Sequence, residues 1–229
     1  MSAFNEILVH QALSLDHENV LKTEKFFMEQ TANGISLIIV MPYCELGDLE
    51  YYMKRSKKKL SERRILQLMT QIVRGVVYIH SKGVIHRDLK ASNVLCTQKV
   101  GSPDAIVLKI ADFGMAKNTL VSDAKTTCGT LYFCSPEIYN SEPYTLTADV
   151  WSLGIILLWM FTGRYLDLKI QSNRDQVLKS LQSSSVCSQP TVYEQLIFSM
   201  TNFDPQSRIS SQEVLDKLEQ LISQTTGDG

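Results

Sequence analysis

A short polar segment, IHRDLKASN, interrupts an otherwise apolar stretch of the chain. It places the carboxylate of Asp88 beside the cations Arg87 and Lys90 and ends on the amide of Asn93. A second carboxylate, Asp112, ends the strand-like sequence LKIAD further along. Carboxylate and amide oxygens are hard ligands that suit Mg²⁺, and an ammonium group can neutralise a phosphate. These residue types therefore suit chemistry on a phosphate group. A structural ion pair between Asp88 and Arg87 is the alternative interpretation.

The order of these motifs resembles the eukaryotic protein kinase family, Ser/Thr type. The catalytic-loop pattern H-R-D-L-x-x-x-N matches residues 86–93, and the D-F-G pattern matches residues 112–114. The sequence SPE at 135–137 is similar to the family's A-P-E, with serine in place of alanine. Later helical landmarks of the family are matched at 149–154 and 204–208. Residues 135–154 also somewhat resemble the NIMA-related branch.

The resemblance implies an α+β, protein-kinase-like fold with a mainly helical C-terminal lobe and a truncated small N-terminal lobe. We expect a partial N-lobe over 1–44, made of a C helix and two strands, and a C-lobe over 45–224. The seam between them is expected near 45–48, and 225–229 is expected to be a disordered tail.

The same resemblance implies ATP and Mg²⁺ as cofactors and transfer of the ATP γ-phosphate to protein Ser or Thr hydroxyls. Asp88 would accept or orient the proton of the substrate hydroxyl, and Lys90 would place its ammonium against the moving phosphate. Asn93 and Asp112 would supply the oxygen ligands for Mg²⁺.

The nucleotide site is expected on the segment IIVMPYCELGD and on one residue beyond the catalytic loop. Met41 resembles the family's gatekeeper. Pro42 would begin the hinge that pairs with adenine, at a position that offers only its carbonyl, and Cys44 would donate its N–H. Leu95 would lie beneath the purine ring. Asp48 would accept from ribose hydroxyls, or would cap the helix that follows it, and the two roles can coexist.

Regulation by phosphorylation is expected in the segment AKTTCGTLYF. Thr126 or Thr127 is spaced like the family's phosphorylated threonine, and a phosphate there would pair with Arg87 and Lys117. Thr130 resembles the residue that hydrogen-bonds the catalytic aspartate in Ser/Thr kinases. Solvent-exposed threonines in a surface loop are the alternative interpretation.

Two structural roles are also expected. Glu137 and Arg208 should form a buried ion pair, as the resemblance implies. His86 should support the packing of its loop, because the histidines show no metal-ligand spacing.

Hydrophobic periodicity predicts the elements that hold these residues. Apolar residues at helical spacing predict helices at 4–15, 60–83, 147–163 and 210–222. Strand-like composition predicts strands at 19–27 and 36–43, with a turn at 32–34. Ser61 is the expected N-cap of the second helix and Gly83 its end, and Ser210 with Glu213 has capping-box spacing.

The family's Gly-rich loop and ATP-anchoring lysine strand are missing from the sequence, whose first glycine is Gly34. Glu6 is the candidate for the glutamate that would pair with that lysine, or it is an exposed helix carboxylate. A two-stranded ribbon would leave Ile38, Ile39 and Val40 without cover, which predicts a partner that completes or stabilises the N-lobe.

Three explanations of these missing segments stay open. The chain is a fragment or an incomplete gene model, or a divergent enzyme that recruits a partner, or a nonenzymatic interaction module. The alternative function is therefore a catalytically inactive pseudokinase that binds proteins.

Composition narrows the partners and the compartment. The 229 residues carry a formal net charge of -1, so charge gives no drive toward nucleic acid or an anionic membrane. The five scattered cysteines favour neither a disulfide framework nor a zinc site, and they fit a reducing cytoplasm or nucleus. The start lacks a basic leader, and the longest apolar run, 154–161, is too short to span a bilayer. We expect protein substrates, no nucleic acid and no membrane.

Overall fold

The computed structural model describes residues 16–31, 34–56, 60–118, 133–164 and 191–224. Several expectations fall outside these ranges: the helix at 4–15 with Glu6, the tail at 225–229, and Thr126, Thr127 and Thr130.

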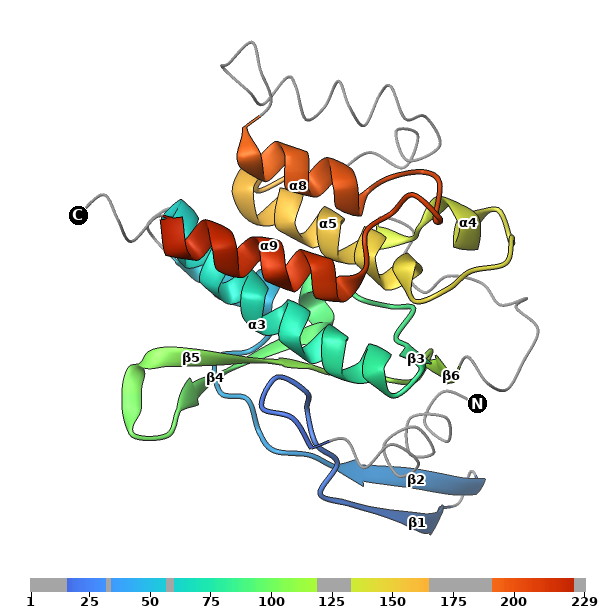
Figure 1. Cartoon of the computed structure of the whole chain (residues 1–229). Helices are drawn as coiled ribbons and strands as arrows, with labels where there is room; N and C mark the ends of the chain where they lie inside the picture. Colours follow the sequence, from blue (N-terminus) through green and yellow to red (C-terminus); the bar gives the residue numbers. More distant parts are fainter. Residues whose placement is uncertain (1–15, 32–33, 57–59, 119–132, 165–190, 225–229) are drawn as a thin grey trace.

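Helices α3 (Glu62–Ser81) and α5 (Thr147–Thr162) form the centre of the molecule (Figure 1). The Ser61 side chain accepts from the N–H of Arg64 and so caps α3, as expected. Gly83 and Gly163, which follow the two helices, both have a φ of 69°, a left-handed conformation that glycine adopts without strain. The predicted bounds of these helices are therefore confirmed to within two residues.

Two further helices cover this centre. Helix α9 (Ser211–Gln224) packs on α3, and α8 (Val192–Met200) packs on α5 (Figure 1). The expected capping box of α9 is present, because the Ser210 N–H donates to the Glu213 carboxylate and the Glu213 N–H donates to the Ser210 hydroxyl. Helix α8 was not predicted, and it begins with a capping box of its own.

The strands of the described residues form three antiparallel pairs. Strand β1 (Lys25–Thr31) pairs with β2 (Gly34–Val40), and β4 (Val94–Lys99) pairs with β5 (Ser102–Ile110). The short strand β3 (Val84–Ile85) pairs with β6 (Lys117–Asn118). Together with the helices they give the expected α+β composition.

The predicted bounds of the first two strands were partly wrong. Residues 19–21 do not extend β1, because the Leu21 N–H donates to the Ile110 carbonyl and the Ile110 N–H donates to the Asn19 carbonyl. This segment therefore docks beside β5. Strand β2 ends at Val40 and not at residue 43, because residues 41–48 form the connection to the helical part.

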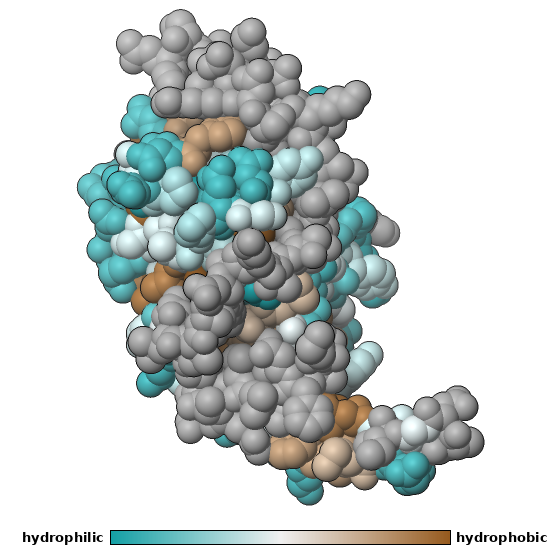
Figure 2. Space-filling view, turned by 90° about the vertical axis from the view of Figure 1, so that its right-hand side faces the viewer, coloured by the Kyte–Doolittle hydropathy of each residue, from teal (hydrophilic) through white to brown (hydrophobic). Residues whose placement is uncertain are grey.

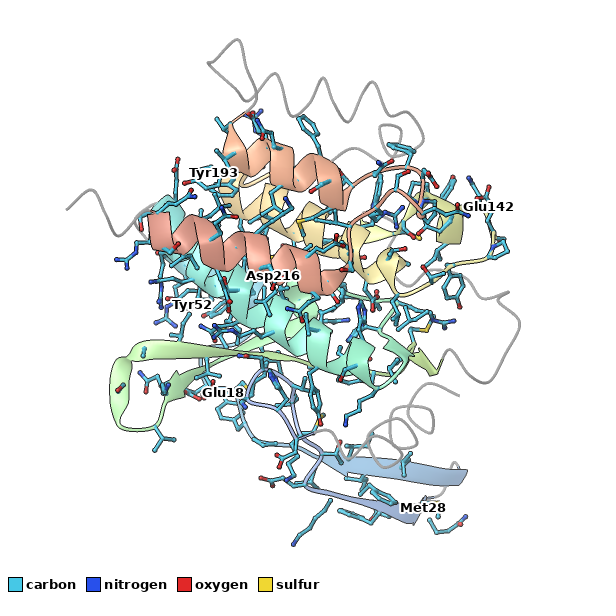
Figure 3. All side chains as sticks on the ribbon, in the orientation of Figure 1. Glu18, Met28, Tyr52, Glu142, Tyr193 and Asp216 are labelled. Carbon is cyan, nitrogen blue, oxygen red and sulfur yellow. The ribbon has the colours of Figure 1, made fainter. Side chains whose placement is uncertain are left out.

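The β1–β2 ribbon lies apart from the helices and exposes apolar side chains on its surface. Phe27 is 50% exposed and Met28 is 64% exposed, and Figure 3 shows Met28 at the end of the molecule away from α8. Figure 2 shows hydrophobic atoms gathered at the same end. The apolar residues Ile38, Ile39 and Val40 are half-buried, so they are less exposed than the sequence suggested.

Three short helices complete the described elements: α2 (Leu49–Arg55), η1 (Ala91–Asn93) and α4 (Pro136–Tyr139). Within the described ranges, every helix is too short or too polar to cross a membrane.

Candidate functional site

Asp88 lies at the centre of a compact polar cluster between β3 and β4. Its carboxylate oxygen Oδ2 accepts from the Lys90 ammonium at 2.7 Å and from the Asn93 amide Nδ2 at 3.0 Å. Asn93 Nδ2 also donates to the Asp88 carbonyl at 2.8 Å. The structure thus brings the three predicted catalytic residues together, and the other carboxylate oxygen of Asp88 has no hydrogen-bond partner among the described residues.

The backbone of this loop is held by Asp149, from the first turn of α5. One Asp149 oxygen accepts from the His86 N–H at 2.8 Å, and the other accepts from the Arg87 N–H at 2.9 Å. Arg87 has a φ of 67°, a conformation that costs free energy for a residue with a Cβ. The two hydrogen bonds to one carboxylate stabilise this strained turn just before Asp88.

Asp149 is almost completely buried, and it also accepts from His80 Nε2 at 2.9 Å. Burial alone would raise the pKa of the Asp149 carboxyl, but hydrogen bonds from His80 and His86 outweigh burial and lower its pKa. The carboxylate therefore stays charged and keeps its hold on the loop at neutral pH.

His86 is fully buried and links the loop to the strand that precedes Asp112. Its Nε2 donates to the Ala111 carbonyl at 3.0 Å, and its Nδ1 accepts from the Asp88 N–H at 3.3 Å. An Nδ1 that accepts requires the neutral ring, and burial lowers the pKa of His86 despite nearby carboxylates that raise it. The predicted packing role of His86 is confirmed.

Ala111 provides a second link between the loop at residues 86–93 and the strand end before Asp112, because its N–H donates to the backbone carbonyl of Asn93 at 2.8 Å. Asp112, the next residue, has a φ of 63° and an exposed side chain. Phe113 is fully buried, with its ring 4.9 Å from that of His86. Anchors on both sides thus hold Asp112 at the surface beside the Asp88 loop.

The side-chain oxygens of Asn93 and Asp112 are of the ligand type that Mg²⁺ prefers, so the two residues could hold the predicted ion. Because Asn93 Nδ2 donates to Asp88, the side-chain amide oxygen Oδ1 of Asn93 remains as the group that can face a cation. The Asp112 carboxylate accepts a 3.3 Å hydrogen bond from Gly114 N–H, and Asp112 is exposed. No cluster of three or more His, Cys, Asp or Glu side chains within the described ranges could hold a metal ion. An Mg²⁺ ion held by one carboxylate, one amide and phosphate oxygens needs no such cluster.

Most of the predicted nucleotide residues lie along the connection between β2 and α2, and Leu95 lies on β4. Cys44 is buried in a small apolar cluster with Leu21, Ala111 and the half-buried Leu95. Met41 is 37% exposed at the end of β2. The structure thus brings Cys44 and Leu95 into one apolar patch, next to the residue that precedes Asp112.

Asp48 caps α2, since its carboxylate accepts from the Tyr51 N–H at 2.7 Å. The capping role that the sequence allowed is therefore confirmed. The ribose role remains a prediction, and the carboxylate is half-buried in the same segment as Cys44.

Other predicted contacts have clear outcomes. Glu137 and Arg208 form the expected buried ion pair, with two hydrogen bonds of 2.6 and 2.9 Å. The Arg87 guanidinium donates to the Met115 carbonyl and to the Tyr144 hydroxyl, both at 2.6 Å. The Asp88 carboxylate accepts hydrogen bonds from Lys90 and Asn93, so these contacts do not favour the alternative of a structural Asp88–Arg87 ion pair.

Sequence reasoning missed the role of Asp149 as the anchor of the loop. A usable signal was present, because Asp149 is the one charged residue in α5, whose other side chains are mostly apolar and buried. A buried carboxylate requires hydrogen-bond donors, but the pattern alone does not say that they come from residues more than sixty positions away.

Comparison with known proteins shows which proteins the chain is similar to. The family model described as "Protein kinase domain" matches residues 1–218. The chain is 35% identical over 225 residues to a probable serine/threonine-protein kinase nek1 of Dictyostelium discoideum, covering 89% of this chain and 45% of the relative. It is 33% identical over 217 residues to serine/threonine-protein kinase PLK4 of Xenopus laevis, covering 93% of this chain and 22% of the relative.

A human relative, serine/threonine-protein kinase ULK1, is 37% identical over 183 residues, which cover 78% of this chain and 17% of the relative. The chain therefore spans less than half the length of these curated relatives.

Proposed function

This chain belongs to the protein kinase family, and we propose that it transfers the terminal phosphate of ATP to Ser or Thr hydroxyls of protein substrates. The observation that carries the proposal is the cluster of Asp88, Lys90 and Asn93, joined through Ala111 to Asp112. Each of these side chains has the chemistry that phosphoryl transfer requires, and none of the four is replaced by an inert residue.

In this proposal Asp88 orients the substrate hydroxyl and accepts its proton as the phosphate is attacked. The Asp88 oxygen that neither Lys90 nor Asn93 contacts is the atom available for that hydrogen bond. Lys90 holds its ammonium 2.7 Å from the other oxygen, so it brings a positive charge beside the site where negative charge develops.

Asn93 and Asp112 would hold Mg²⁺ through their side-chain oxygens. The bound ion would neutralise charge on the phosphates of ATP. The chain itself holds these two ligands in place, because the backbone of Asn93 is hydrogen-bonded to Ala111 and the amide of Asn93 to Asp88.

We further propose that adenine contacts the apolar patch of Leu95 and Cys44, with the Cys44 N–H as a donor and Met41 at its edge. Pro42 would offer its carbonyl. Asp48 would accept from the ribose while it caps α2. An apolar patch beside a backbone donor is a common form of nucleobase site.

The exposed apolar side chains of the β1–β2 ribbon support a further protein partner that covers this end of the molecule. A reducing compartment, cytoplasm or nucleus, is proposed because Cys44, Cys96 and Cys134 are buried and form no disulfide among the described residues.

The proposal is tested with purified full-length chain, γ-labelled Mg-ATP and a generic protein acceptor. We expect label on Ser or Thr of the acceptor, and a loss of about 10²-fold or more in the Asp88→Asn variant. Asn has the same size as Asp, so a melting curve should show that the variant remains folded.

Two outcomes contradict the proposal. Transfer that persists unchanged in Asp88→Asn would place the chemistry elsewhere. Absence of transfer, together with no stabilisation of the wild-type chain by Mg-ATP, would leave a protein-binding module without catalysis.

A further inference from the structure

We propose that Glu45 is a positioning residue that fixes the nucleotide-binding segment, residues 41–48, on the outer edge of β4. This inference rests on the proposed function and extends it, since it names the side chain that keeps the adenine contacts in register. Glu45 does not touch the reacting atoms, so its effect should appear in ATP affinity and not in the rate of chemistry.

Glu45 contacts β4 with both carboxylate oxygens. Oε1 accepts from the backbone N–H of Gln98 at 2.6 Å, and Oε2 accepts from the Thr97 hydroxyl at 2.8 Å. Hydrogen bonds to a charged acceptor are stronger than neutral ones, and two of them on one carboxylate fix its orientation.

The contact lies on an edge that strand pairing leaves open. Among the described residues the sheet that contains β4 has two strands, so β5 satisfies one edge of β4. On the other edge the Leu46 N–H donates to the Cys96 carbonyl at 3.2 Å, and the Cys96 N–H donates to the Gly47 carbonyl at 2.8 Å. An isolated bridge between Asp48 and Leu95 continues this pairing.

The backbone pairing of residues 46–48 with residues 95–96 forms a short ladder. The Glu45 side chain extends this ladder by one hydrogen bond, to Gln98. Its carboxylate takes the place that a backbone carbonyl would have at Gln98. Cys44 directly precedes Glu45 in the sequence, so this side-chain contact lies one residue from the proposed adenine donor.

The ladder also determines where Cys44 lies relative to Leu95. Both residues line the same apolar cluster, but they are far apart in the sequence, since Cys44 lies on the connection after β2 and Leu95 lies on β4. If the hydrogen bonds of the Glu45 carboxylate are removed, residues 41–45 gain conformational freedom, and nucleotide binding must then order these residues. The expected result is weaker binding with an unchanged catalytic loop.

The charge of Glu45 is maintained by the same contacts. The pKa of the Glu45 carboxyl is lowered by hydrogen bonds from the Gln98 N–H, from the backbone N–H of Glu45 itself and from the Thr97 hydroxyl. The side chain is exposed, so the effect on overall stability should be small, which separates a positioning role from a structural one.

The test compares wild-type chain with Glu45→Ala, Glu45→Gln and Thr97→Val. Glu219→Ala serves as a matched control, because Glu219 is also an exposed carboxylate with one polar partner, Arg74, on a distant helix. For each protein, calorimetry gives the Kd for Mg-ATP, steady-state kinetics give KM for ATP and kcat, and hydrogen exchange reports the Gln98 amide.

We expect Glu45→Ala to raise Kd and KM for ATP by about threefold to tenfold, with kcat within about twofold of wild type. The Gln98 amide should exchange faster in this variant. Glu45→Gln should recover part of the affinity, because the amide oxygen can still accept from Gln98. Glu219→Ala should leave all three measurements unchanged.

The inference is overturned if wild-type chain binds Mg-ATP and Glu45→Ala binds it equally well, or if Gln98 exchange does not change. It is also overturned if kcat falls as much as the affinity for ATP does, since that result would mean that Glu45 positions the catalytic loop. Absence of Mg-ATP binding by wild-type chain would instead contradict the proposed function itself, and the inference with it.

Discussion

The His86 side chain shows how one buried residue can hold two parts of the candidate site together. Its neutral ring donates to the Ala111 carbonyl and accepts from the Asp88 N–H. A protonated ring would turn a second N–H toward the Asp88 N–H and would place an additional charge in a fully buried position. Because burial lowers the pKa of His86, the neutral ring is the stable form in the folded protein.

Stability should therefore fall as the pH decreases below about 6.5, the ordinary histidine pKa. In this range the unfolded chain takes up a proton at residue 86 and the folded chain does not. The loss is at most about 1.4 kcal/mol per pH unit and continues until the pH reaches the folded-state pKa. Urea unfolding at pH 7.5, 6.5 and 5.5 measures it.

His86→Gln should show a smaller decrease across this range, because glutamine does not titrate. His17→Gln is the control, since burial also lowers the pKa of the less buried His17. An identical pH dependence in wild type and His86→Gln would show that His86 is not responsible.

Helix α3 approaches two other segments closely at Gly75. A Cβ at this position would lie 2.7 Å from the Asn19 carbonyl oxygen and 2.8 Å from Ile110 Cδ1. The Asn19 carbonyl also accepts from the Ile110 N–H, and the Asn19 side chain donates to the Leu108 carbonyl. The absence of a side chain at Gly75 thus lets residues 19–21 lie between α3 and β5.

Gly75→Ala should destabilise the protein by about 1–3 kcal/mol, although alanine has the better helix propensity by up to ~1 kcal/mol. Backbone atoms cannot move away as a flexible side chain can, so overpacking should outweigh propensity. Urea unfolding measures the change, with Arg63→Ala, at an exposed position of α3, as the control. A Gly75→Ala variant more stable than wild type would mean that the close approach does not persist in solution.

The Glu137–Arg208 pair joins distant parts of the whole helical lobe. Glu137 lies on α4 and Arg208 precedes α9, and both side chains are almost completely buried. The guanidinium also donates to the Thr147 carbonyl at the start of α5, and it lies 5.3 Å from the Trp151 ring. A buried pair with further hydrogen bonds has few ways to rearrange when one member is lost.

Arg208→Ala should therefore cost about 3–5 kcal/mol of folding free energy, because it leaves the Glu137 carboxylate buried without its partner. Arg74→Ala, which removes an exposed pair with Glu219, should cost less than about 1 kcal/mol. Thermal and urea unfolding of both variants test the contrast. Equal losses in the two variants would show that burial does not set the strength of these pairs.

The sequence alone determined the features that depend on neighbouring residues. Asp88, Lys90 and Asn93 meet because only five positions separate the first from the last, and the caps at Ser61 and Ser210 act within one helical turn. Local geometry fixes such contacts once the loop or helix forms. The family resemblance supplied the fold, and the Glu137–Arg208 pair followed from it.

Only the tertiary structure decided which distant groups hold these local features in place. Three contacts join segments that lie about fifty to ninety positions apart in the sequence. They are the hydrogen bonds of Asp149 to the loop at His86, the contact of Glu45 with Gln98, and the docking of residues 19–21 beside β5. The first strand was predicted too early in the chain for the same reason, because residues 19–21 pair with β5 and not with β2. Packing of the helices brings these segments together. The pattern of residue types along the chain does not show which hydrogen-bond donor meets which acceptor across that distance.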